Sequence, residues 1–147
     1  MNPSPRIGVF YSHGPHFLRV LKQVRQKQPG ATLIAFVPHT FPAQYLEGIV
    51  SEVHRTAGTR PAAALKTLRQ LRAARLDEFI VMFDSPRLQL LAALSGAPTR
   101  ACHTVDGRQR PINFQVIRPL LRWATRRIRG QFTYWRIRRI VRSQSLD

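Results

Sequence analysis

Residues 77–104 read DEFIVMFDSPRLQLLAALSGAPTRACHT, and this stretch decides the fold class. The nearly continuous apolar run at 78–83 is typical of a strand that is covered on both faces. A helix is predicted over 85–97, because a Ser-Pro pair suits its start and a glycine suits its end. The short run at 99–105 predicts another strand. A strand, a helix and a strand in this order indicate one unit of a parallel sheet.

The same alternation fills the earlier part of the chain. Short apolar runs that end at glycine or proline predict further strands, and apolar residues at helical spacing predict the helices between them. The sequence therefore predicts an α/β, Rossmann-like domain with a mostly parallel sheet of about five strands and helices on both faces. The additional predicted strands are 6–12, 31–37 and 49–56, and the additional predicted helices are 16–30 and 60–77.

Composition narrows the class of protein. The 147 residues include 24 Lys and Arg against 7 Asp and Glu, a formal charge of +17. Cys102 is the single cysteine, so an internal disulfide is impossible and a reducing compartment fits best. The sequence shows no signal peptide and no apolar run long enough to span a membrane. It also lacks His, Cys or acidic residues at the spacings typical of metal sites. We therefore expect a cytoplasmic protein without a metal or other cofactor.

The positive charge is concentrated near the C-terminus. Residues 108–147 contain 11 arginines and one acidic residue, so we divide the chain into a Rossmann-like domain, 1–107, and an Arg-rich amphipathic helical tail, 108–147. Arginines on one helix face with apolar and aromatic residues on the other favour contact with an anionic membrane surface. The predicted membrane-binding residues are Arg118, Arg122, Trp123, Arg126, Arg129, Trp135 and Arg139.

Two other interpretations of the tail stay open. The helix could pack on the sheet through its apolar face and leave its arginines in solvent. Alternatively, the tail could bind nucleic acid, although no recognition module is visible in the preceding domain. Membrane contact would place the protein at the cytoplasmic face of the membrane.

Candidate site residues lie where the predicted strands end, since ligands of parallel sheets bind at the carboxyl ends of strands. The loop SHGPH, 12–16, offers His13 and His16 as candidate general bases. This loop lacks both the dinucleotide and the P-loop glycine patterns, so a phosphate-binding turn is not indicated. The alternative role of the two histidines is helix capping or simple exposure to solvent.

A second set of candidates surrounds DSPR, 84–87. Asp84 and Ser85 could orient a substrate hydroxyl, and Arg87, together with Arg60 in another strand-end loop, could contact a phosphate. The alternative is that Asp84 or Ser85 caps the following helix while Arg87 is solvated.

Residues 67–103, TLRQLRAARLDEFIVMFDSPRLQLLAALSGAPTRACH, resemble the N-terminal half of the lipopolysaccharide heptosyltransferase family. Arg87 and the helix LLAALSGA, 90–97, fit the family pattern, and the opening strands fit it more loosely. The resemblance covers about residues 6–105. It implies the GT-B architecture, in which two Rossmann-like domains flank a cleft and the C-terminal domain binds a sugar nucleotide.

The chain departs from the family in three respects. In one of them, the acid common at the end of the fourth strand is displaced, with Val81 roughly in its place and Asp84 three residues on. The first loop of the family carries a Gly-Asp pair whose Asp is the expected base, whereas this chain has SHGPHF there. A donor-binding domain is not found in the 147 residues. The resemblance therefore implies a membrane-surface acceptor-binding half of a glycosyltransferase in lipopolysaccharide-type glycan assembly, completed by a partner chain that carries the sugar-nucleotide-binding domain. The alternatives are a non-catalytic membrane adaptor and a nucleic-acid-binding protein.

Overall fold

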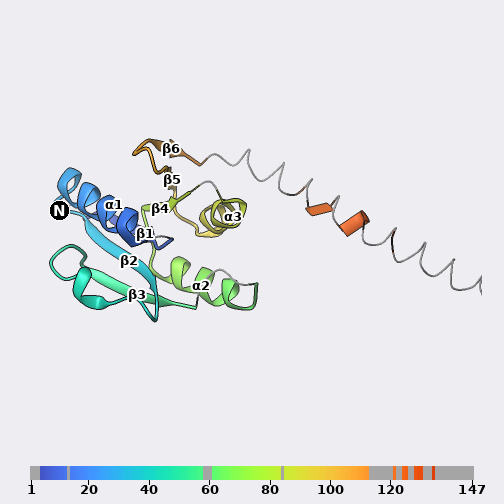
Figure 1. The fold of residues 1–147 in the computed structure, drawn as a ribbon, viewed down its shortest axis with the longest axis horizontal. Coiled ribbons are helices and arrows are strands. Elements are labelled where there is room, and N and C mark those ends of the chain that lie inside the picture. The colour runs from blue at the N-terminus through green and yellow to red at the C-terminus, as the bar shows by residue number, and fades with distance from the viewer. Residues whose placement is uncertain are drawn as a thin grey trace, which may run out of the picture. The chain divides into compact units, whose positions relative to one another are not determined.

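The computed structural model contains two compact units, Met1–Asn113 and Phe114–Asp147, and each is considered by itself. Figure 1 shows the course of the chain. The structure describes residues 4–12, 14–57, 61–83 and 85–112 of the first unit, and residues 121, 124, 125, 128–130 and 134 of the second.

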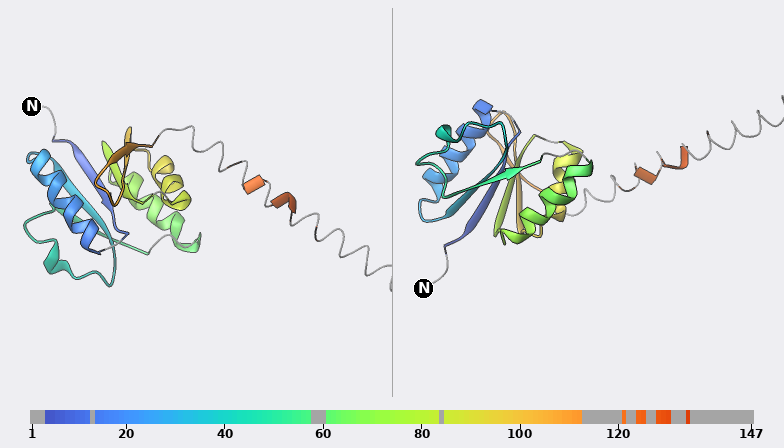
Figure 2. Two further views of the ribbon diagram at one scale, coloured as in Figure 1. Left: turned by 45° about the horizontal axis from the view of Figure 1, so that its top comes forward. Right: turned by 90° about the horizontal axis from the view of Figure 1, so that it is seen from below.

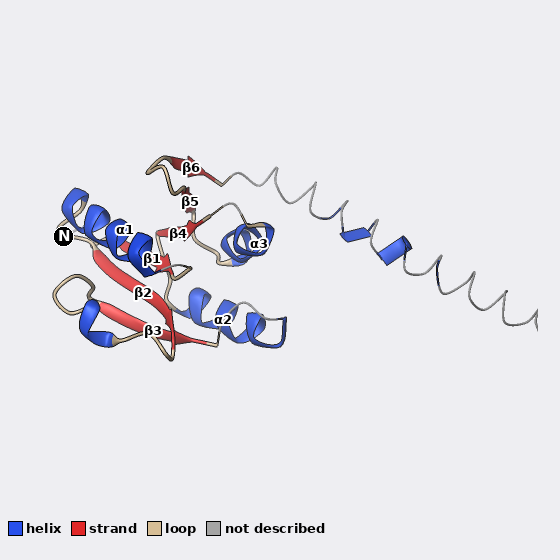
Figure 3. Cartoon of the chain, in the orientation of Figure 1, coloured by secondary structure: helices blue, strands red, loops and turns tan. Residues whose placement is uncertain are grey.

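The first unit is a six-stranded sheet in the order β3-β2-β1-β4-β5-β6, with helices between the strands (Figures 1 and 3). Strands β1 to β5 pair in parallel, and β6 is antiparallel to β5. The predicted Rossmann-like α/β fold is confirmed. The elements are β1 (Arg6–Phe10), α1 (Gly14–Lys27), β2 (Thr32–Pro38), the 3-10 helix η1 (Ala43–Tyr45), β3 (Glu52–Thr56), α2 (Pro61–Ala73), β4 (Glu78–Met82), α3 (Pro86–Leu94), β5 (Thr99–His103) and β6 (Gln109–Pro111).

Helices cover both faces of the sheet, as Figure 2 shows. Alternate residues of a strand point to opposite faces, so the central strands contribute to two separate cores. Val9 and Met82 pack on the face that α1 covers, whereas Phe10 and Val81 pack on the face covered by α2 and α3. Burial on both faces explains why β1 and β4 read as continuous apolar runs.

Strand β6 lies beyond the boundary that the sequence predicted after Gly107. A tight turn joins β5 to β6, in which the N–H of Gly107 donates to the carbonyl of Thr104 and Gly107 has φ +77°. The two compact units divide between Asn113 and Phe114. All three residues of β6 are exposed, so this edge strand carries no apolar pattern that the sequence analysis would detect.

The described residues of the second unit are helical at 121, 124, 125, 128–130 and 134. The Thr125 hydroxyl donates to the carbonyl of Leu121 at 2.8 Å, a bond within one helical turn. Leu121 and Ile128 are both more than half exposed. Within the described part of the chain, no helix combines the length and apolar character needed to cross a membrane.

Gly8 permits a close contact between β1 and Leu76, which follows α2. A Cβ atom added to Gly8 would lie 2.5 Å from Cδ1 of Leu76 and 3.0 Å from Cε2 of Phe36. Both neighbouring side chains are buried, so they cannot move away freely. We expect Gly8→Ala to lower the free energy of unfolding by about 1–3 kcal/mol through overpacking.

This expectation is checked by urea denaturation, with Gly30→Ala as the matched control. Nothing lies within 4 Å of a Cβ added to Gly30, so that variant should match the wild type. Equal stability of the two variants would show that the Leu76 contact does not constrain the fold.

Candidate functional site

The chain changes direction across the sheet between β1 and β4. From β1 it passes through α1 on one face to β2, whereas from β4 it passes through α3 on the other face to β5. Because β1 and β4 are neighbours, their following loops diverge and leave a position between them at the carboxyl edge. Ligands of open α/β sheets bind at such a position.

Two buried histidines lie at this edge, His16 in the first turn of α1 and His103 at the end of β5. They are 7% and 5% exposed. The His16 ring lies 5.7 Å from the ring of Phe83, and the N–H of Phe83 donates to the carbonyl of His103 at 3.3 Å. We call His16, Phe83 and His103 the histidine site. It is assembled from α1, the end of β4 and β5.

The backbone at the centre of this site is unusual. Phe83 has φ +69°, in the left-handed region that bulky residues seldom occupy. Such a conformation costs of order 1–3 kcal/mol and persists where the surrounding structure enforces it, often at ligand sites. The strained residue contacts both histidines, by its ring and by its N–H.

The hydrogen bonds of His16 fix its proton. Nη2 of Arg19 lies 2.9 Å from Nδ1 of His16 and 3.3 Å from the carbonyl of Val105. Because a guanidinium only donates, Nδ1 is the acceptor and the ring proton lies on Nε2. Within the described part of the chain, Nε2 of His16 is buried and has no hydrogen-bond partner.

His103 is more isolated still. Neither ring nitrogen of this buried side chain has a partner among the described residues. Burial lowers the pKa of His103, and the positive charge of Lys27 acts in the same direction, so the ring is neutral near pH 7. The buried hydroxyl of Ser12, in the loop after β1, is likewise unpaired within the described residues. Buried polar atoms are nearly always paired, so this group indicates a place for a ligand or ordered water.

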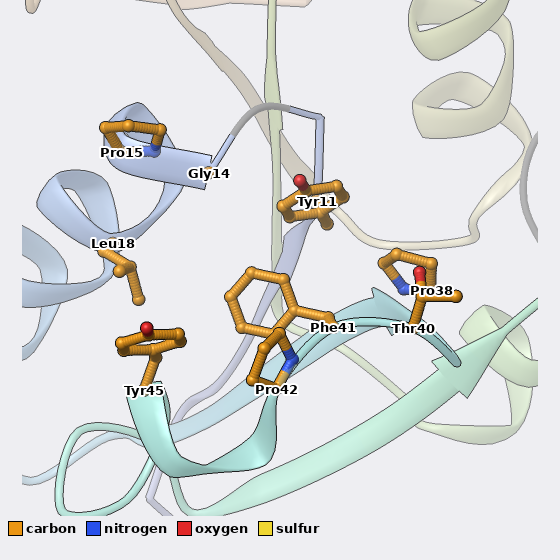
Figure 4. A pocket seen from close by; sticks show the side chains of 9 residues that line it. All are labelled: Tyr11, Gly14, Pro15, Leu18, Pro38, Thr40, Phe41, Pro42 and Tyr45. Atoms are coloured by element: carbon orange, nitrogen blue, oxygen red, sulfur yellow. The ribbon is translucent and has the colours of Figure 1, made fainter.

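A pocket of about 450 Å³ lies over the carboxyl ends of β1 and β2. Figure 4 shows the rings of Tyr11, Phe41 and Tyr45 along it. The ring centroids of Tyr11 and Phe41 are 5.1 Å apart, and those of Phe41 and Tyr45 are 6.4 Å apart, both edge to face. We call this the aromatic pocket. Its other lining residues are Gly14, Pro15, Leu18, Pro38, Thr40 and Pro42.

Arg55 of β3 holds the loop that carries much of the aromatic pocket. Its Nη1 donates to the carbonyls of Pro38 at 3.0 Å and Phe41 at 2.6 Å. The aromatic pocket combines aromatic faces with the hydroxyl groups of Tyr11, Thr40 and Tyr45. Such a lining suits an uncharged ligand whose ring carries polar groups at its edges. The first turn of α1 contributes to both places, through Gly14 and Pro15 to the aromatic pocket and through His16 to the histidine site.

The structure places several predicted site residues. His16 is buried at the carboxyl edge and does not face solvent. Ser85 occupies the N-cap position of α3, but its side chain makes no capping hydrogen bond. Arg87 is exposed and makes no hydrogen bond or ion pair among the described residues. Arg129 is helical and exposed. The following predicted residues lie outside the described part of the chain: His13, Arg60, Asp84, Arg118, Arg122, Trp123, Arg126, Trp135 and Arg139.

Sequence reasoning missed His103 and the aromatic pocket. His103 closes a predicted strand, and Ala101 two residues earlier faces the α1 core, so strand alternation was a usable signal. Tyr11 and Phe41 had no comparable signal, because only the folded structure brings the loops after β1 and β2 together. Among the described residues, no group of three or more His, Cys, Asp or Glu is placed to hold a metal ion.

No family model matches the sequence, and no curated protein matches it. Two solved structures do resemble the fold. A glycosyl transferase of family 9 from Veillonella parvula DSM 2008 has a TM-score of 0.55 and 18% sequence identity, over 71% of this chain and 33% of that chain. The E. coli ADP-heptose lps heptosyltransferase II has a TM-score of 0.53 and 18% identity, over 67% of this chain and 30% of that chain.

The likeness is one of fold. The chain has a Rossmann-like domain of the kind found in GT-B glycosyltransferases, as the resemblance of residues 67–103 led us to expect. It spans about a third of the length of these two solved chains. Its assignment to the acceptor-side half stays a prediction.

The lowered pKa of His103 makes stability depend on pH. The ordinary pKa of the side chain is 6.5 and the folded-state pKa is lower, so the unfolded chain binds more protons between the two values. The free energy of unfolding should therefore fall as the pH drops from about 7.5 to about 5. His103→Leu removes this contribution, and urea denaturation across the pH range measures the difference between the two proteins.

Comparison with the variant isolates His103 from other titrating groups. Burial raises the pKa of Glu78, which acts in the opposite direction near and above 4.5 and is common to both proteins. Parallel stability curves for the wild type and His103→Leu would contradict the expectation.

Proposed function

We propose that this chain is the acceptor-binding part of a glycosyltransferase of cell-surface glycan assembly, of the lipopolysaccharide type. One observation carries the proposal. In a fold like that of known glycosyltransferases, the carboxyl edge holds an aromatic pocket beside unpaired buried imidazoles. Aromatic rings stack on the apolar faces of sugars, and imidazole nitrogens bond to hydroxyl groups.

The predicted polar residues have roles under this proposal. Of the two candidate bases, His13 keeps the proposed role of base toward an acceptor hydroxyl. Nδ1 of His16 accepts from Arg19 and its Nε2 carries the ring proton, so His16 would instead donate a hydrogen bond to the acceptor. Arg87 is a cation without a partner among the described residues, which favours an acceptor that carries a phosphate. Arg60 has the same proposed role. Asp84 and Ser85, in the loop after β4, would orient the acceptor.

Donor binding is proposed to come from elsewhere. One neighbour is the E. coli ADP-heptose lps heptosyltransferase II, and this chain covers 30% of it. The sequence also lacks the glycine-rich patterns that cradle dinucleotide or nucleoside phosphates. We therefore propose that the sugar nucleotide binds to a domain outside these 147 residues, on a partner chain.

The tail supports a location at an anionic membrane surface. Residues 108–147 carry 11 arginines and one acidic residue, and Leu121 and Ile128 present exposed apolar side chains seven positions apart, on one side of a helix. A helix of this kind lies in the interface with its cations at the lipid headgroups. The acceptor of a surface-glycan enzyme is itself anchored in a membrane, so both parts of the proposal agree.

Acceptor binding is tested by calorimetry with deacylated lipopolysaccharide core oligosaccharide, with ADP-heptose as the donor probe. The chain should bind the oligosaccharide and not ADP-heptose. Tyr45→Ala removes an exposed ring of the aromatic pocket and should weaken oligosaccharide binding about tenfold. Leu65→Ala, at an exposed position of α2, is the control and should bind as the wild type does. Absence of oligosaccharide binding would favour the non-catalytic adaptor.

Membrane binding is tested by vesicle co-sedimentation with anionic and neutral lipids. Replacing Arg118, Arg122 and Arg126 by Gln should weaken anionic binding by more than about a hundredfold, because each basic residue contributes about 1 kcal/mol at such a surface. A control of equal charge replaces Lys22, Lys66 and Arg69, which are exposed in the first unit, and should have little effect. Equal loss in both proteins, or salt-sensitive binding to RNA or DNA without lipid preference, would contradict the membrane role.

A further inference from the structure

We propose that His16 and His103 together form a binding site for sugar hydroxyl groups. The inference rests on the proposed function and deepens it, because it names the chemical groups of the acceptor that the carboxyl edge recognises. It concerns His103 as much as His16. The two side chains come from elements that are far apart in the sequence and meet only in the folded domain.

The two rings belong to one place in the structure. Phe83 joins them, with its ring 5.7 Å from the His16 ring and its N–H bonded to the His103 carbonyl. Met82 and His103 are paired residues of β4 and β5, and the Met82 side chain lies in the core beneath α1. Since β5 is parallel to β4, His103 points to the same face as Met82, where the first turn of α1 carries His16.

The hydrogen-bonding capacity of the pair selects the ligand. Nε2 of His16 carries a proton, because Nδ1 accepts from Arg19. Neutral His103 offers one N–H donor and one acceptor nitrogen, and all three atoms are buried and unpaired within the described residues. A hydroxyl group donates and accepts, so it satisfies both kinds of atom.

Other ligand classes fit less well. A phosphate or carboxylate only accepts, so it would leave the acceptor nitrogen of His103 unpaired in a buried place. A metal cation would leave the N–H groups unpaired. Arg19, which could attract an anion, is already bonded to His16 and to the carbonyl of Val105. An ordered water has the same capacity as a hydroxyl, and it is the group that a sugar would displace.

Two independent features mark the site as more than packing. Buried nitrogen atoms without partners destabilise a fold, and a strained Phe83 between them adds to that cost. Natural chains tolerate such costs mainly where a ligand uses them. The aromatic pocket begins at the same turn of α1, through Gly14 and Pro15, so an oligosaccharide can present one ring to the pocket and hydroxyls to the histidines.

The test observes the imidazole nitrogens directly by ¹⁵N NMR of the full chain. The probes are methyl glycosides of mannose and heptose, with inorganic phosphate as the contrasting anion. Glycosides should shift the ring resonances of His16 and His103. His54 is the internal control, because it is paired with Glu52 at 3.4 Å and lies against Phe36, and its resonances should not move.

Variants supply the second readout. His103→Leu should weaken glycoside binding about tenfold while keeping the free energy of unfolding at pH 7 at or above the wild-type value, since it removes two unpaired buried nitrogens. His54→Leu should leave binding unchanged. The proposal would be overturned if His103→Leu bound glycoside as tightly as the wild type does. It would also be overturned if bound glycoside left the ring resonances of His16 and His103 unshifted, or if phosphate shifted them and glycoside did not.

The outcomes separate this inference from the proposed function. If core oligosaccharide binds while both rings stay silent, the hydroxyl site is wrong and the acceptor-binding role stands. If glycosides shift the rings but the oligosaccharide does not bind, the hydroxyl site stands and the proposed acceptor is wrong. If no sugar shifts the rings and none binds, both are wrong.

Discussion

The close approach of Leu76 to Gly8 sets the geometry on which the rest of the domain depends. β1 is the central strand of the parallel sheet and is covered on both faces. The side chains of β1 therefore set how closely the covering segments approach the sheet. The absence of a Cβ at Gly8 lets the chain after α2 lie directly against β1 and enter β4 beside it. The positions of β1 and β4 in turn place the loops that form the carboxyl-edge site.

Many arginines of this fold form hydrogen bonds to backbone carbonyls in place of salt bridges to acidic side chains. With 24 basic and 7 acidic residues, most cations have no acidic partner to choose. In the described residues several guanidinium groups donate instead to backbone carbonyls at chain reversals: Arg25 bonds to the carbonyls of Ile49, Pro29 and Ala31. Arg55 and Arg72 do the same at the aromatic pocket and at the end of α3. A planar group with five donors can join several carbonyls at once, which a lysine cannot do.

The histidine site shows a conflict between stability and ligand recognition. Burial keeps His103 neutral, which disfavours the folded state at low pH. Its nitrogens also have no hydrogen-bond partner among the described residues, which disfavours the folded state at any pH. The aromatic pocket has no such conflict, because its rings pack on one another whether or not a ligand is present. The two sites at the carboxyl edge therefore differ: the aromatic pocket is lined by well-packed rings, whereas the histidine site holds polar atoms without hydrogen-bond partners among the described residues.

The sequence by itself determined the α/β class, the parallel sheet and the covered strands, because burial on two faces forces apolar runs such as EFIVM in β4. It also marked His16 and the DSPR loop, because strand ends are visible as breaks in those runs. Only the tertiary structure decided that His103 joins His16, that Phe83 is strained between them, and that Tyr11 and Phe41 share a pocket. These are contacts between segments distant in sequence, set by the order of strands and the path of α1, and no local pattern encodes them. The sequence analysis did not predict β6, because all three residues of this edge strand are exposed and so show no alternation of apolar and polar residues.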